Sequence, residues 1–109
     1  MIRLLTWNAQ GVGNISTLKR LKKLISMHNI SLIILQEPLI STVSEVSRKI
    51  GFDNFCSNIN NKIWILSRHG LVVQLLSSSD QFLHFMVNTS TSMGAVCVTG
   101  IYATHTKIG

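Results

Sequence analysis

The fold is decided by Leu32-Ile33-Ile34-Leu35-Gln36-Glu37, a short apolar run that ends in an amide and a carboxylate. The earlier stretch Leu4-Leu5-Thr6-Trp7-Asn8 has the same form, with a polar group after its apolar residues. Such runs predict buried strands, and a crossover helix between them predicts that the strands lie parallel. Because the carboxyl ends of parallel strands meet at one edge of a sheet, we expect Asn8 and Glu37 to emerge side by side.

The segment between the two runs has the pattern of an amphipathic helix. Gly11 and Gly13 permit a tight loop after the first strand. Ser16 is a suitable N-cap for a helix from about Thr17 to His28, and Asn29 suits the left-handed turn that ends a helix. The polar side of this helix carries four basic residues: Lys19, Arg20, Lys22 and Lys23.

A second, shorter helix is predicted after the second strand, where Thr42 and Glu45 fit a capping box and Gly51 suits the helix end. The rest of the chain has the pattern of strands separated by turns, predicted at 52–59, 62–67, 71–76, 81–87 and 95–103. The predicted class is therefore α/β of the α+β kind. We expect one mixed sheet, built from a βαβ unit and an antiparallel meander, with helices on one face.

Composition narrows the class of protein. The 109 residues suffice for one small domain, and 46% hydrophobic against 13% charged residues argues against intrinsic disorder. A net charge of +6 suits a polyanionic partner, although it can equally serve solubility.

Cys56 and Cys97 lie in apolar runs and are predicted to be reduced core residues. With neither a signal-peptide pattern nor a membrane-spanning run, we expect an intracellular protein, nuclear or cytoplasmic, not secreted and with no membrane partner.

The two strand ends and the loop between them resemble the endonuclease/exonuclease/phosphatase superfamily. The residues that carry this resemblance are Trp7, Asn8, Gly11, Gly13, Gln36 and Glu37. Within the superfamily, the chain is similar to the N-terminal part of the endonuclease domain of plant LINE-type retrotransposons, which are non-LTR reverse transcriptase proteins. The further matching segments are Lys62-Ile63-Trp64-Ile65-Leu66, Ser79-Asp80-Gln81 and Ile101-Tyr102-Ala103.

The resemblance implies a truncated Mg²⁺-dependent phosphodiesterase of the DNA-endonuclease kind. Residues 1–109 would form the N-terminal half of a four-layered α/β sandwich, a partial domain with its C-terminal half missing. Glu37 and Asn8 match the family's metal-site residues, and with Tyr102, which matches a position facing the scissile phosphate, they are the candidate catalytic residues. The family's Asp-x-Asn and Ser-Asp-His motifs have no counterpart in the 109 residues, so we expect no catalysis by this chain alone.

Plainer roles stay open for each candidate residue. Glu37 can simply leave the sheet into solvent or cap the helix that follows, and Asn8 can be a turn residue at a strand end. The ring of Tyr102 can rest on the sheet with its hydroxyl in water. None of the four histidines is paired at a spacing typical of metal ligands.

Other functions also stay open. The main alternative is a non-catalytic basic module that binds nucleic acid or a protein partner; a small-molecule or lipid phosphatase of the same superfamily is a third possibility. DNA is the expected partner of the intact family domain. Because this chain would supply only one of two packed sheets, we also expect an exposed sheet face that favours pairing or aggregation.

Overall fold

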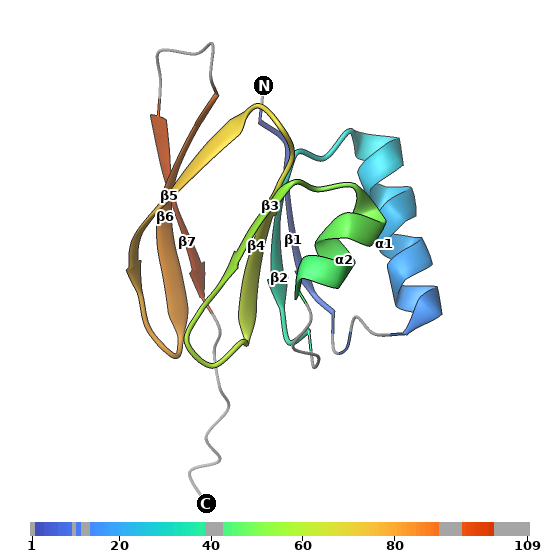
Figure 1. Cartoon of the computed structure of the whole chain (residues 1–109), viewed down its shortest axis with the longest axis horizontal. Helices are drawn as coiled ribbons and strands as arrows, with labels where there is room; N and C mark the ends of the chain where they lie inside the picture. The colour runs from blue at the N-terminus through green and yellow to red at the C-terminus, as the bar shows by residue number, and fades with distance from the viewer. Residues whose placement is uncertain (1, 10, 12–13, 39–42, 90–94, 102–109) are drawn as a thin grey trace, which may run out of the picture.

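The computed structural model describes residues 2–9, 11, 14–38, 43–89 and 95–101. Two helices cover one face of a four-stranded sheet, and a three-stranded sheet covers the other, so the chain forms three layers (Figure 1). The predicted α+β class is confirmed. The elements in chain order are β1 (Leu4–Asn8), α1 (Ile15–His28), β2 (Leu32–Gln36), α2 (Val43–Ile50), β3 (Asn54–Ser57), β4 (Ile63–Ser67), β5 (Leu71–Ser78), β6 (Phe82–Thr89) and β7 (Ala95–Ile101).

The four-stranded sheet has the order β1-β2-β4-β3 and is mixed, as expected. Strand β1 pairs with β2 in parallel, and β4 runs antiparallel to both β2 and β3. Four of the five residues of β2 and all five of β4 are buried. Since both of these central strands are covered on two faces, their sequences are nearly uniform runs of apolar residues.

The ends of the helices follow local side-chain chemistry. Helix α1 begins two residues before its predicted start, because the N-cap is Asn14, whose Oδ1 accepts from the backbone N–H of Ser16 at 2.8 Å and from its hydroxyl at 3.0 Å. Ser16 is therefore not the cap. The predicted left-handed helix ends are confirmed at Asn29, with φ 50°, and at Gly51, with φ 77°. Thr42 lies outside the described residues.

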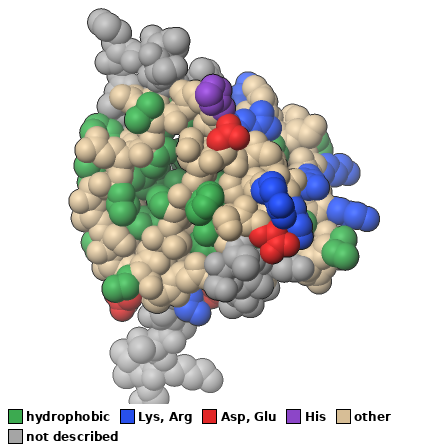
Figure 2. All heavy atoms as spheres, in the orientation of Figure 1, with side chains coloured by type: hydrophobic (Ala, Val, Ile, Leu, Met, Phe, Trp, Pro, Cys, Tyr) green, Lys and Arg blue, Asp and Glu red, His purple; other side chains and the backbone are tan. Residues whose placement is uncertain are grey.

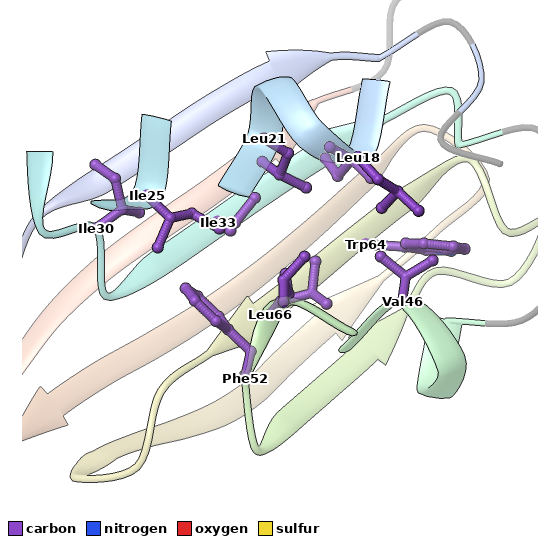
Figure 3. Close-up of a cluster of buried hydrophobic side chains, with 11 residues drawn as sticks. Leu18, Leu21, Ile25, Ile30, Ile33, Val46, Phe52, Trp64 and Leu66 are labelled. Atoms are coloured by element: carbon purple, nitrogen blue, oxygen red, sulfur yellow. The ribbon is translucent and has the colours of Figure 1, made fainter. Parts of the chain in front are cut away.

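A cluster of eleven buried side chains, here called the helical core, fills the layer between the helices and the mixed sheet. Figure 3 shows leucine and isoleucine side chains of α1 above the sheet, with the Trp64 ring beside Val46. The prediction that Trp64 packs against the helices is thus confirmed. The helical core consists of Leu18, Leu21, Ile25, Ile30, Ile33, Leu35, Val46, Ile50, Phe52, Trp64 and Leu66.

A second cluster, here called the inter-sheet core, joins the two sheets. The predicted meander divides after β4, because within the described residues β5, β6 and β7 form a separate sheet, in the order β5-β6-β7. The expectation of an uncovered face on the mixed sheet is therefore wrong for β2 and β4, whose side chains contact those of β6. The inter-sheet core consists of Leu32, Ile34, Ile63, Ile65, Leu83, Phe85 and Val87.

The two cysteines have different surroundings. Both are free thiols, but only Cys56 is partly buried. The prediction of a core position is wrong for Cys97, which is exposed, because β7 is an edge strand of the three-stranded sheet and Cys97 lies on its outer side. Over the described part of the chain, neither helix is long and apolar enough to cross a membrane.

Candidate functional site

The strand ends meet as predicted. Asn8 is the register partner of Gln36, so it lies one residue from Glu37 across the parallel pair. Beyond the strands, the backbone N–H of Ala9 donates to the carbonyl of Gln36 at 2.9 Å, and that of Gly11 donates to the carbonyl of Glu37 at 2.9 Å. The loop after β1 is therefore tied to the chain leaving β2, which fixes the two candidate residues relative to each other.

Glu37 has an unusual backbone conformation for a residue with a side chain. Its φ is 52°, in the left-handed region, which is unfavourable by roughly 1–2 kcal/mol for a residue other than glycine. Its N–H donates to the carbonyl of Lys62 at 2.9 Å, and its carbonyl accepts from Gly11. Hydrogen bonds on both sides hold this conformation, and such outliers are concentrated at functional sites. The left-handed conformation is a second feature, independent of the strand-end position, that marks Glu37 as a candidate functional residue.

The alternation along the two strands gives Asn8 and Gln36 a common face of the mixed sheet. Leu4 and Leu32 lie on the side that meets the three-stranded sheet, and Asn8 and Gln36 share their parity. Asn8 is exposed there. The Gln36 side-chain amide donates to the backbone carbonyl of Ile101, the last residue of β7. The end of β7 is therefore held beside the ends of β1 and β2.

Sequence reasoning missed this role of Gln36, which it treated only as part of the family motif. The available signal was the position of an amide at the end of an otherwise apolar strand, the same signal that identified Asn8. Tyr102 follows Ile101 directly but lies outside the described residues, so the structure does not place its hydroxyl.

Asn58 is a buried amide at this end of the molecule that the sequence did not single out. Its Oδ1 accepts from the backbone N–H groups of Lys62 and Ile63, each at 2.9 Å, and its Nδ2 donates to the carbonyls of Ser79 and Asp80 at 3.1 and 3.3 Å. One side chain thus joins the β3–β4 turn to the β5–β6 turn. Its role is structural: it fixes both turns at the same end of the sheets as Glu37.

The oxygen donors at this edge suit a hard cation. Carboxylate and amide oxygens, completed by water and substrate phosphate, are the ligands typical of Mg²⁺. Glu37 supplies a carboxylate and Asn8 an amide, so the residues present fit part of such a site. Within the residues that the structure describes, no three His, Cys, Asp or Glu side chains form a group that could hold a metal ion.

Two histidines and a cysteine lie on other surfaces of the molecule. His69 Nδ1 is 4.0 Å from Asp53 Oδ2, with both side chains largely exposed, and His84 Nδ1 is 2.7 Å from the Thr99 hydroxyl on the outer sheet. Cys56 lines an open groove of about 510 Å³ between the edge strands β3 and β5, and burial raises the pKa of its thiol. None of these residues belongs to the group formed by Asn8, Gln36 and Glu37.

Comparison of the chain with protein-family models and with curated proteins found no match. A functional proposal therefore depends on the geometry of the strand-end site, which comprises Asn8, Gln36 and Glu37, and on the motifs that carry the family resemblance.

Proposed function

We propose that this chain is part of a Mg²⁺-dependent phosphodiesterase domain of the DNA-endonuclease kind, derived from a LINE-type retrotransposon, and that it acts in the nucleus or cytoplasm. The observation that carries the proposal is the strand-end site, where Asn8 lies beside Glu37 and Glu37 is held in a left-handed conformation. The motifs from Trp7 to Glu37 support the same assignment.

Each residue of the site has a proposed task. Glu37 would hold the cation through a carboxylate oxygen, and Mg²⁺ would supply neutralisation of charge on the phosphate. Asn8 would donate its amide N–H to a phosphate oxygen or orient the carboxylate. Gln36 acts as a positioning residue, because its bond to Ile101 holds β7 beside the site.

The 109 residues by themselves are proposed to bind without cleaving. They contain neither an Asp-x-Asn sequence to position the attacking water nor a Ser-Asp-His sequence to stabilise developing charge. Groups that act as a unit lose most of their rate when one is missing. We therefore expect no nicking of supercoiled plasmid by this chain in Mg²⁺.

Cation binding provides the direct test. Titration of Mn²⁺, monitored by electron paramagnetic resonance, is expected to show one weak site in the wild-type chain and its loss in Glu37→Gln. The matched control is Glu45→Gln, which removes a carboxylate paired with Lys49 on α2, at 3.3 Å, and should leave the site intact. Equal binding by wild type and Glu37→Gln would refute the metal assignment.

The reading frame provides a second test. Sequencing the transcript beyond the codon for Gly109 would support the proposal if it encodes the two missing motifs in frame. Glu37→Ala then becomes the activity control for the longer protein. A frame that continues into an unrelated domain would contradict the endonuclease assignment.

A non-catalytic nucleic-acid-binding module is the second candidate function. The observation that favours it is the distribution of charge: Lys and Arg side chains gather over α1 and α2, while the visible part of the three-stranded sheet is mostly apolar or uncharged (Figure 2). A basic face of this kind can neutralise a phosphate backbone whether or not the strand-end site binds a metal.

A further inference from the structure

We propose that a cleft between the C-terminal halves of α1 and α2 binds the phosphate groups of a nucleic-acid backbone. This inference rests on the second candidate function, to which it assigns a site. The cleft has a volume of about 460 Å³. Its charged lining residues are all cationic: Lys22, Arg48, Lys49 and Arg68.

Three elements that are distant in sequence supply these cations. Lys22 comes from the middle of α1, Arg48 and Lys49 from the last turn of α2, and Arg68 from the turn after β4. Basic residues in a last turn are favoured by the helix dipole, which accounts for the pair on α2. The dipole does not account for Lys22 or Arg68. These residues converge on the same cleft only in the tertiary structure. Positive charges placed close together repel one another, and a bound anion relieves this repulsion.

The acidic residues nearest to this cluster leave most of its charge uncompensated. Glu45 pairs with Lys49 at 3.3 Å, and Asp53 faces His69. Among the residues that the structure describes, Lys22, Arg48 and Arg68 form no ion pair within 4.0 Å. The Arg68 guanidinium carbon lies 5.3 Å from the centre of the Phe52 ring, which holds this cation in place by a cation–π contact.

The shape of the site favours a nucleic-acid backbone over a membrane surface. Among the described residues that line the cleft, the apolar ones are Ile25 and Ile50. They are buried, at 3% and 9% exposed, so neither projects into a bilayer. An open site with cationic sides suits a chain of phosphates, which it can neutralise with release of counterions.

The cleft and the strand-end site lie at opposite ends of the mixed sheet. Ser67, which precedes Arg68, is the register partner of Leu32, whereas Ile63 is the partner of Gln36. A five-residue strand spans roughly 16 Å. Nucleic acid bound in the cleft is therefore expected not to require the Glu37 carboxylate.

The test is a titration of a fluorescein-labelled 20-base-pair duplex with the full chain, followed by anisotropy at several salt concentrations. The cleft variant is Lys22→Ala with Arg48→Ala. The matched control is Arg20→Ala with Lys23→Ala, which also removes one arginine and one lysine, from exposed positions of α1 outside the cleft. All four side chains are exposed, and thermal melts will verify that both variants fold.

We expect the cleft variant to bind the duplex roughly tenfold more weakly than the wild type. The slope of log affinity against log salt concentration should fall in magnitude by about 2 in this variant, and the affinity of the control variant should change less than about threefold. Equal losses of duplex affinity in the two variants would overturn the assignment of binding to the cleft, since they would show that affinity depends only on the total positive charge. Binding to phosphatidylserine vesicles without binding to the duplex would overturn it in favour of a membrane. Absence of duplex binding by the wild type would refute this inference and the second candidate function, but not the Mn²⁺ result at Glu37.

Discussion

The two faces of the mixed sheet are covered in different ways. On one face, α1 and α2 close over eleven buried side chains; on the other, the three-stranded sheet encloses seven, and an open groove remains between β3 and β5. Amphipathic helices can adjust their position to cover an apolar sheet, whereas a second twisted sheet diverges from the first at its edges. Both clusters are buried, but we expect the two layers to respond differently to the loss of a side chain.

The largest expected effect is on the helical face. Trp64→Ala removes a fully buried indole whose Nε1 donates to Asn61 Oδ1 at 2.6 Å, and it should lower the free energy of unfolding by about 3–5 kcal/mol. Urea unfolding followed by far-ultraviolet circular dichroism measures this. Trp64→Phe keeps most of the side-chain volume and should lower the free energy of unfolding by about 1–2 kcal/mol. A loss for Trp64→Ala no larger than that for Trp64→Phe would show that the helical core is loosely packed.

Adjacent residues of β2 allow the two faces to be compared directly. Ile33 belongs to the helical core and Ile34 to the inter-sheet core, and both are almost fully buried. Ile33→Ala should lower the free energy of unfolding by about 3–4 kcal/mol and Ile34→Ala by about 2–3 kcal/mol, because Ile34 belongs to the smaller of the two clusters of buried side chains. The same urea titration measures both. Equal losses would contradict the proposed difference in packing.

A smaller effect tests how closely the sheets approach. A Cβ added at Gly100 would lie 3.1 Å from Ile34 Cγ2 and 3.5 Å from Ile63 Cγ2. Gly100→Ala should therefore destabilise the chain by about 1–2 kcal/mol. In the Ile34→Ala background, which removes the close methyl group, most of this loss should disappear. A double-mutant cycle measures the coupling, and simple additivity would show that the sheets separate freely at this point.

The strain at Glu37 can be measured at the edge where the two sheets come together. Glu37→Ala and Glu37→Gly both remove the carboxylate, but glycine adopts a φ near 52° without penalty. The glycine variant should be more stable than the alanine variant by about 0.5–1 kcal/mol. The matched control is the same pair of substitutions at the helical residue Glu45, where alanine should be the more stable. The same order at both positions would exclude strain at Glu37.

The smallest expected effect concerns the groove beside the inter-sheet core. Burial raises the pKa of Cys56, so Cys97 should react first with iodoacetamide, as peptide mass spectrometry can follow. Because the pKa of Cys56 is raised in the folded state, the free energy of unfolding is higher below the ordinary thiol pKa than above it. This contribution is lost as pH rises through the ordinary thiol range, because the unfolded thiol ionises first. Cys56→Ala should remove this pH dependence. Reaction of Cys56 as fast as Cys97 would show that the groove opens readily.

Much of the fold was predictable from local patterns. The apolar run ending at Gln36 indicated a strand buried on both faces, and Asn29 and Gly51 marked the helix ends, because these properties depend on periodicity and backbone preference. The neighbouring positions of Asn8 and Glu37 followed from parallel pairing. The N-cap was misassigned by two residues, since Asn14 and Ser16 are both good caps and only the backbone geometry selects one.

The elements, their class and the polar strand ends follow from the sequence alone, because these depend on residues close together in the chain. Only the tertiary structure divided the meander into two sheets, exposed Cys97 and joined Gln36 to Ile101, since alternating strands carry no signal of which sheet they enter. It alone also brought Lys22, Arg48 and Arg68 to one cleft. Convergence of residues from distant segments depends on how the layers pack, and packing depends on the complementarity of whole surfaces.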